Sequence, residues 1–326
     1  MPFIVDAPGP PLFIIVNAES GHNDIATVCQ TIETMLKQAG RRYKLIVVDD
    51  PAKLEQTAQD ASEQACKCQG AVVVAGGDGS INTVAQVTFR TGCPLGVIPQ
   101  GTFNYFGREH GISSDTTEAV RALLSSRPQA VQVGVVNDRL FLVNASLGLY
   151  PKLLEDREAF KQQYGRNRLV ALVSGLITLL GQRGQLRITL RLQGKDHEIR
   201  TPTLFVGNNR LQLKQIGISL ENNIGSGELA AIALRPVGTF AMLWLLVRSA
   251  FGELGEAHDV INFSFEHMII RPTRDRYRKR RVKVATDGEI ARMDMPLEFR
   301  VSPHPLLLLK PDTVVASPDS ATGSNA

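Results

Sequence analysis

One segment combines glycines, a carboxylate and a hydroxyl directly after the apolar run 71–75: Gly76-Gly77-Asp78-Gly79-Ser80. Glycines let a backbone approach an anion closely, and a helix that starts there presents free N–H donors and a positive dipole end. The segment therefore predicts a phosphate-binding loop, with an ordinary strand–helix turn as the alternative. Since a carboxylate repels phosphate, Asp78 is expected to organise the loop, bind a metal or contact a sugar hydroxyl.

Two further polar segments follow predicted strands. Asn17 with Ser20 and Gly21 follows the run 12–17, and Gly101-Thr102-Phe103-Asn104 follows the run 95–99. In open α/β sheets, ligands bind at the carboxyl ends of the strands, so these segments should meet the glycine loop there. Late in the chain stands Asp287-Gly288-Glu289, which taken alone predicts a hairpin turn.

The first part of the chain alternates strands and helices. Apolar runs predict strands at 12–17, 43–48, 71–75 and 95–99, and helical spacing predicts helices at 24–38, 51–67 and 80–89. This alternation favours a Rossmann-like α/β domain, a parallel sheet with helices on both faces.

From about residue 131 the pattern becomes antiparallel. Asn137-Asp138 predicts a hairpin turn, and strands are expected at 186–192, 198–206, 228–234, 260–270, 282–286 and 297–301, interrupted by helices at 157–180 and 239–251. We expect an antiparallel β-sandwich-type domain. The predicted boundaries are an α/β nucleotide-binding domain over 1–130, a β-rich domain over 131–304, a strand at 305–311 that returns to the first domain, and a disordered tail over 312–326.

Composition and length fit a globular chain. The 326 residues are 43% hydrophobic and 21% charged, with a net charge of +4. Four cysteines lack the paired spacing of a zinc site. Neither a signal peptide nor an apolar run of the ~20 residues that span a bilayer is predicted. A cytoplasmic protein is expected, with membrane contact only at the inner membrane face as a peripheral protein.

Together these segments resemble the superfamily of diacylglycerol, sphingosine and NAD kinases and phosphofructokinases. Residues 99–108 are similar to the G-T-x-N-[DH]-[FL]-A-[RK] segment of the diacylglycerol kinase-like catalytic domain, and residues 16–21 to its N-P-x-S-G turn. Asp287-Gly288-Glu289 matches the D-G-E of bacterial lipid kinases, and residues 144–149 resemble N-x-[AS]-x-G. The resemblance covers residues 12 to 311.

The resemblance implies an ATP-dependent lipid kinase with Mg²⁺ on its nucleotide, bound in a cleft between two domains. It implies Glu289 as the general base for the lipid hydroxyl, with Asp287 beside it. The implied nucleotide-binding residues are Asn17, Ser20, Gly21, Gly76, Gly77, Asp78, Gly79, Ser80, Asn82, Gly101, Thr102 and Asn104. The alternatives are an NAD kinase-like small-molecule kinase and a catalytically silent protein that binds nucleotide or lipid.

Two departures from the family pattern bear on the site. Tyr105 stands where many members have Asp, and Ser226 replaces the aspartate of a structural Mg²⁺ site, with Glu228 as a substitute ligand. No metal-ligating residue is therefore assigned. The sequence does not indicate which lipid is the acceptor or what the oligomeric state is.

One stretch is strongly basic. Eight Lys and Arg residues, from Arg271 to Lys283, stand against one acid. They predict a solvated hairpin, attraction to anionic lipid headgroups at ~1 kcal/mol per basic residue, or support for ATP binding. Nucleic acid is not an expected partner, because no nucleic-acid module accompanies the stretch. The apolar segments 169–180 and 240–247 predict core helices or interfacial helices at a lipid entry groove.

Overall fold

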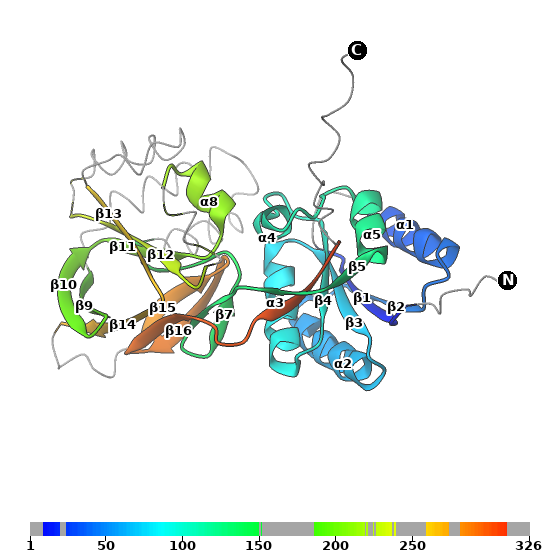
Figure 1. The fold of residues 1–326 in the computed structure, drawn as a ribbon, viewed down its shortest axis with the longest axis horizontal. Coiled ribbons are helices and arrows are strands. Elements are labelled where there is room, and N and C mark those ends of the chain that lie inside the picture. The colour runs from blue at the N-terminus through cyan, green and yellow to red at the C-terminus, as the bar shows by residue number, and fades with distance from the viewer. Residues whose placement is uncertain are drawn as a thin grey trace, which may run out of the picture.

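The computed structural model describes residues 9–19, 24–149, 151, 186–218, 220, 224, 226–236, 238, 259–273 and 281–311. Within these ranges the chain forms two lobes that lie side by side (Figure 1). Several predictions fall outside the described residues: Ser20, Gly21, the helices at 157–180 and 239–251 with their apolar segments, residues 274–280 of the basic stretch, and the tail.

The first lobe is a six-stranded sheet with the strand order β2-β1-β3-β4-β18-β5. Strands β1 to β4 are parallel, and β18 pairs parallel to β4 and antiparallel to β5. Its elements are β1 (Leu12–Asn17), α1 (Ile25–Gln38), β2 (Tyr43–Val48), the 3-10 helix η1 (Pro51–Lys53), α2 (Leu54–Lys67), β3 (Ala71–Gly76), α3 (Asp78–Thr91), β4 (Leu95–Pro99), α4 (Tyr105–Glu109), α5 (Thr116–Leu124), β5 (Ser126–Val131) and β18 (Leu306–Pro311).

Helices cover both faces of this sheet. Helix α1 packs against α5, and α2 packs against α3 on the other face (Figure 1). Strand β3 is therefore buried along its whole length and is apolar from Ala71 to Ala75, as expected for a central parallel strand. Helix α1 starts where the Asp24 carboxylate accepts the Thr27 N–H, and α3 ends at Gly92 with a φ of 71°.

The second lobe is built from two antiparallel six-stranded sheets, ordered β10-β9-β14-β17-β6-β7 and β13-β12-β11-β8-β15-β16. A common apolar core, which includes the edge-to-face pair Phe141 and Phe299, contains residues from both sheets. The strands are β6 (Gly134–Val136), β7 (Arg139–Phe141), β8 (Asn144–Gly148), β9 (Leu186–Leu192), β10 (Lys195–Thr201), β11 (Thr203–Gly207), β12 (Leu229–Leu234), β13 (Val260–Phe265), β14 (His267–Pro272), β15 (Arg281–Thr286), β16 (Glu289–Asp294) and β17 (Leu297–Val301), with the short helix α8 (Arg210–Gln215).

The predicted fold class, an α/β unit followed by antiparallel sheets, is confirmed. Two strand predictions were wrong in their extent. The run 198–206 is two strands, β10 and β11, in different sheets, and the run 260–270 is likewise β13 and β14. Pro202 cannot donate to a ladder, so the chain changes sheets there. At Glu266 and His267 two exposed residues follow one another, so the alternation of buried side chains changes phase where the chain changes sheets.

Several elements were not predicted, among them α4, α5, α8, β5 and β16. Strand β5 carries Arg127 and Pro128, which argue against a strand in sequence, but it lies at the edge of its sheet, where proline is tolerated. Strand β18 lies between β4 and β5, so the chain returns to the first lobe at its end. The domain boundaries at 130/131 and 304/305 stay a prediction.

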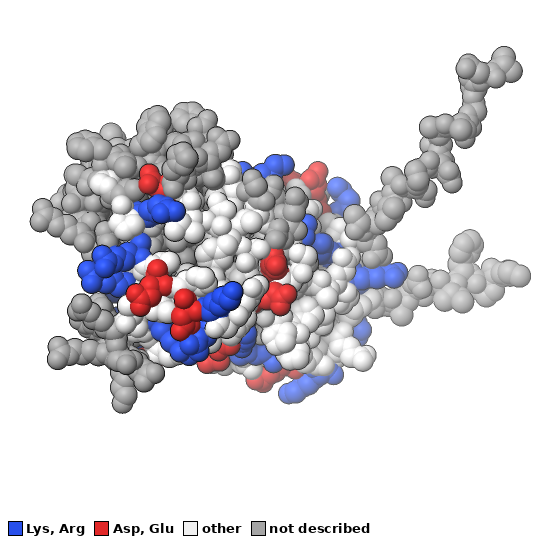
Figure 2. Space-filling view, turned by 60° about the vertical axis from the view of Figure 1, so that its left-hand side comes forward, with Lys and Arg blue, Asp and Glu red and all other residues white. Residues whose placement is uncertain are grey.

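Surface charge is mixed on the second lobe. Lys and Arg side chains alternate with Asp and Glu on the face in Figure 2. At the end of the basic stretch, Arg281 forms an ion pair with Asp294 at 3.2 Å. Among the described helices, none is long and apolar enough to cross a membrane.

Burial of β18 gives a stability prediction. Leu308 is fully buried in the first core, whereas the neighbouring Leu307 is half-buried on the opposite face. Leu308→Ala should lower the free energy of unfolding by about 2–5 kcal/mol, because it leaves a cavity. Leu307→Ala is the matched control and should cost clearly less. Urea unfolding measures both, and equal costs would contradict a central role for β18.

Candidate active site

The glycine loop joins β3 to α3. Helix α3 begins at Asp78, two residues before the predicted start, with Gly77 at the N-cap position. Gly77 has no side chain to cap the helix, so no N-cap side chain occupies its first N–H donors. The loop therefore has the backbone of an anion site at a helix N-terminus.

The loops after β3 and β4 touch through their glycines. A Cβ atom on Gly101 would lie 2.8 Å from the Cα of Gly77 and 2.9 Å from Asn104 Oδ1. The Gln100 N–H donates to the Gly76 carbonyl at 2.9 Å, which continues the strand pairing into the loops. Glycine is therefore required at residue 101 by the close approach of the two backbones.

Asn104 fixes the shape of the second loop. Its Oδ1 accepts the Gly101 N–H at 2.9 Å, and its Nδ2 donates to the Gly101 carbonyl at 2.8 Å. The residue is buried and has a φ of 50°, a left-handed conformation that asparagine tolerates better than most residues. Thr102, which follows Gly101 in this loop, is exposed.

The Asp78 carboxylate bonds to α4. It accepts the N–H groups of Tyr105 at 3.3 Å and Phe106 at 3.4 Å. Burial raises the pKa of Asp78, while the N–H groups of Phe106, Tyr105 and Asn104 lower it. Of the three roles open to Asp78, the geometry supports the first: it organises the loop by holding α4 against it.

The turn after β1 is tied to α3. Asn17 Nδ2 donates to Ser80 Oγ at 2.8 Å, and Asn17 Oδ1 accepts the Glu19 N–H at 3.1 Å. Asn17 and Ser80 are both buried. The structure thus brings the described parts of all three predicted loops together at the carboxyl edge of the parallel sheet.

Asp287 links the two lobes. From the second lobe, its carboxylate accepts a 2.6 Å hydrogen bond from Asn82 Nδ2 on α3. Three backbone N–H groups also donate to it at 2.7–2.8 Å, from Leu142, Val143 and Asn144. Burial raises the pKa of Asp287 to about 6, against these four donors, which lower it. At neutral pH the carboxylate is therefore ionised and saturated with N–H donors.

Glu289 faces the glycine loop. It is exposed and opens β16, directly after the Asp287-Gly288 turn. Its Oε1 lies 3.5 Å from the position that a Cβ atom on Gly79 would occupy. A free carboxylate of the second lobe therefore lies against the first turn of α3, where the phosphate loop begins.

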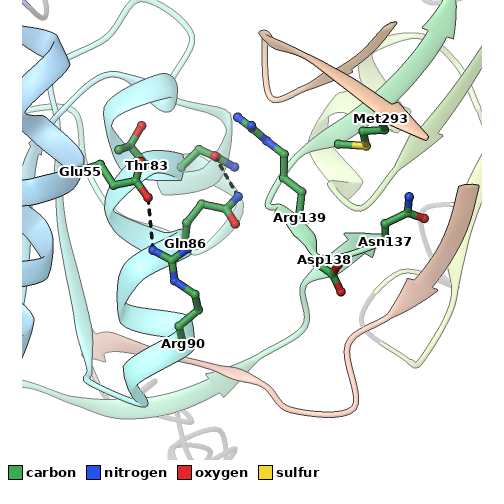
Figure 3. A pocket seen from close by; sticks show the side chains of 9 residues that line it. Glu55, Thr83, Gln86, Arg90, Asn137, Asp138, Arg139 and Met293 are labelled. Carbon is green, nitrogen blue, oxygen red and sulfur yellow. Dashed lines mark hydrogen bonds and ion pairs between the residues drawn. The ribbon is translucent and has the colours of Figure 1, made fainter. Parts of the chain in front are cut away.

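A cavity of about 420 Å³ lies along α3, next to Asn82, which bonds to Asp287. It is open to solvent between α3 and the β6–β7 hairpin (Figure 3), and its lining includes Asn82, Thr83, Gln86, Asp138 and Arg139. Arg139 Nε donates to the Thr286 hydroxyl at 2.9 Å. The cavity is polar and its lining contains both charge signs.

Sequence reasoning missed the residues that join the lobes beside Asp287. Gln86 exchanges hydrogen bonds with the backbone of Leu140, donating at 2.6 Å and accepting at 3.2 Å. Asn209 Nδ2 donates to the Tyr105 carbonyl at 3.1 Å. The Asn208-Asn209 pair at the end of a strand was a usable signal, whereas a lone glutamine on a helix gives none.

The side chains of the described residues indicate whether the protein itself could ligate a metal ion. The described residues contain no group of three or more His, Cys, Asp or Glu placed to hold a metal ion. Asp78 and Asp287 already accept N–H groups, which leaves Glu289 as the open carboxylate at the loop. In the stretch that carries Ser226, Gln132 Oε1 accepts the Gly227 N–H and Gln132 Nε2 donates to the Glu228 carbonyl.

Several known proteins are similar to this chain over part or most of its length. Residues 11–136 match the model of the diacylglycerol kinase catalytic domain. A "Putative lipid kinase" of Staphylococcus epidermidis is 23% identical over 309 residues, which cover 88% of this chain and 91% of that protein. A "Diacylglycerol kinase" of Staphylococcus haemolyticus is 30% identical over 123 residues, 32% of this chain and 37% of that protein.

Other relatives match over less than half their length. The chain spans 45% of a "Probable lipid kinase YegS-like" protein of Cronobacter sakazakii, at 27% identity. Among solved structures, a "putative diacylglycerol kinase" from Bacillus anthracis has a TM-score of 0.70 at 18% identity, over 94% of this chain and 99% of that one, which shows a shared fold. Residues 11–136 are thus similar to the diacylglycerol kinase catalytic domain, and a longer alignment joins most of the chain to a relative named as a putative lipid kinase.

Proposed function

We propose that this protein transfers the γ-phosphate of ATP to a lipid hydroxyl, in the seam between its two lobes. The observation that carries the proposal is the position of Glu289, whose carboxylate lies 3.5 Å from the Cβ position of Gly79 at the start of α3. A general base and a phosphate loop within reach of one another are what hydroxyl phosphorylation requires.

On the nucleotide side, the phosphates bind over the first turn of α3. The backbone N–H groups and the helix dipole stabilise their negative charge. Asn17 and Thr102 flank this position, and the contact of Gly77 with Gly101 leaves no side chain over the loop. Ser20 and Gly21 stay predicted nucleotide contacts. The adjoining cavity is the candidate space for the rest of the nucleotide.

On the acceptor side, Glu289 takes the proton from the lipid hydroxyl. The hydroxyl oxygen forms the new bond to the γ-phosphorus as the bond to the β-phosphate oxygen breaks, and ADP leaves. Asp287 acts as a positioning residue, because its carboxylate is saturated by N–H donors and cannot accept that proton at low cost. Its four hydrogen bonds hold the turn that carries Glu289 against α3.

Mg²⁺ enters this scheme with the nucleotide. The ion prefers oxygen ligands and usually keeps several waters together with substrate phosphates. Of the carboxylates at the loop, Glu289 is the one that could reach such an ion, since those of Asp78 and Asp287 are engaged.

Two other functions remain outcomes of the same test: an NAD kinase-like activity and nucleotide binding without turnover. The test incubates the purified protein with γ-labelled ATP and Mg²⁺, with mixed lipid vesicles or with NAD. Label in the lipid phase supports the proposal, and label on NAD supports the first alternative. ATP binding without transfer to any acceptor supports the second. A lipid panel then identifies the acceptor, which is a separate question.

The role of Glu289 gives a kinetic prediction. Glu289→Gln should reduce kcat by about 100-fold or more, because general bases contribute ~10²–10⁴-fold, while the Kd for ATP stays nearly unchanged. Glu33→Gln is the matched control, since Glu33 is a carboxylate of α1 that pairs with Lys37. Steady-state kinetics and ATP binding measure both variants. Near-normal turnover of Glu289→Gln would remove it as the base.

The hydrogen bonds of Asp287 give a stability prediction. In Asp287→Asn, either orientation of the amide turns its NH₂ towards N–H donors. The variant should lose about 1–3 kcal/mol of unfolding free energy, the usual cost of buried polar groups left unpaired, together with most transfer activity. Unchanged stability would contradict a role for Asp287 in joining the lobes.

The same carboxyl sets a pH dependence. Its pKa of about 6 lies above the ordinary value of 3.8, so between these values the folded state binds more protons than the unfolded state. The contribution of Asp287 to wild-type stability should therefore decline as pH rises from about 4 to 6 and then level off. Asp287→Asn should lack this component in urea unfolding across the range. A component of opposite sign would contradict the raised pKa.

A further inference from the structure

The loop after β4 carries an exposed aromatic ring. Among the described residues, the exposed large hydrophobic side chains are Val47, at 42% exposure, and Phe103, at 57%. Phe103 belongs to none of the hydrogen-bonded contacts that shape the site. The Phe103 ring thus presents an apolar face to solvent beside the phosphate loop.

Phe103 is held in place. Its ring stacks on Tyr105 with centroids 5.6 Å apart and planes 7° from parallel. The Tyr105 N–H donates to Asp78, and the Tyr105 carbonyl accepts from Asn209, one bond to each lobe. Asn104 lies between Phe103 and Tyr105 in the sequence, and its side chain forms two hydrogen bonds with the backbone of Gly101. The aromatic pair is therefore preorganised on a rigid turn, and burying its outer surface would require little further ordering.

Cations lie on the two helices that meet at Tyr105, which opens α4 and bonds to Asn209, the N-cap of α8. Arg108 on α4, and Arg210 and Lys214 on α8, are exposed. The two helices pack together through Glu109, whose carboxylate accepts the Leu211 N–H at 3.0 Å and lies 3.8 Å from Arg210. Exposed aromatic rings next to Lys and Arg are the composition of surfaces that bind the interface of anionic membranes.

We propose that the Phe103–Tyr105 pair and the cations of α4 and α8 form an anchor that rests on an anionic bilayer surface. The partner class follows from the pairing of an exposed apolar ring with basic side chains. A nucleobase stacked on Phe103 is the other outcome that the experiments below distinguish. Given the proposed function, the anchor would place the seam with Glu289 at the surface that supplies the acceptor.

The first experiment measures binding without turnover. Phe103→Trp in a Trp244→Phe background makes residue 103 the single tryptophan of the chain. With vesicles containing one third anionic lipid, its emission should shift to the blue and be quenched by brominated acyl chains. Neutral vesicles and high salt should weaken the effect, because the cations act through screened electrostatics. Absence of both a shift and quenching with anionic vesicles would overturn the proposal.

The second experiment compares affinities. Phe103→Ser should weaken binding to the same vesicles by about tenfold or more, the value of one buried large apolar side chain. Arg210→Gln and Lys214→Gln should each weaken it by about fivefold. Val47→Ser is the matched control, because it also replaces an exposed apolar side chain by serine. It should leave the affinity for the vesicles unchanged. Equal binding of Phe103→Ser and the wild type would overturn the anchor.

A third measurement separates this inference from the proposed function. On a short-chain acceptor dissolved as monomers, Phe103→Ser should keep wild-type turnover, whereas on vesicles its turnover should fall in line with its binding. A tenfold rise in the Kd for ATP with unchanged vesicle binding would assign Phe103 to the nucleotide instead and overturn the proposal. If no lipid is phosphorylated but vesicle binding depends on Phe103, the proposed function fails and the anchor stands.

Discussion

The saturation of one carboxylate by four N–H donors is the constraint on which the candidate site depends. Asp287 belongs to the second lobe, and three of its donors are backbone groups of the chain between β7 and β8, while the fourth is Asn82 on α3. Each bond is short and charge-assisted, the stronger class of protein hydrogen bond. Because one partner lies in the other lobe, the position of the second lobe against α3 is specified at the point where chemistry would occur.

The first lobe reaches the same point by backbone packing. Gly77 and Gly101 approach too closely for side chains, and Asp78 and Asn104 use their polar groups to hold the loops together. This explains why a carboxylate stands in a phosphate loop: its oxygens accept the N–H groups at the start of α4, so its charge is compensated there. No N-cap side chain lies over the first turn of α3.

Much of the first lobe could be predicted from sequence because its signals are local. Buried parallel strands are apolar runs, and the loops after them carry glycine and asparagine for stated backbone reasons. The second lobe was harder, since its strands change sheets at Pro202 and Glu266, inside runs that predict one continuous strand each. The hydrogen bonds between the lobes could not be predicted from sequence, because only the fold brings Gln86 and Leu140 together. Motif resemblance identified Asp287 and Glu289 as a pair, but their different environments appear only in three dimensions.

Those environments follow from the turn between β15 and β16. Thr286 pairs with Glu289 across two residues, Asp287 and Gly288, whose φ angles are 49° and 92°. Positive φ at both central positions is typical of the tight hairpin turns that match strand twist. Such a turn separates two carboxylates that are two residues apart in sequence. It buries Asp287 among donors at the lobe seam and leaves Glu289 exposed over the start of α3, so one short turn provides both a fixed support and a free base.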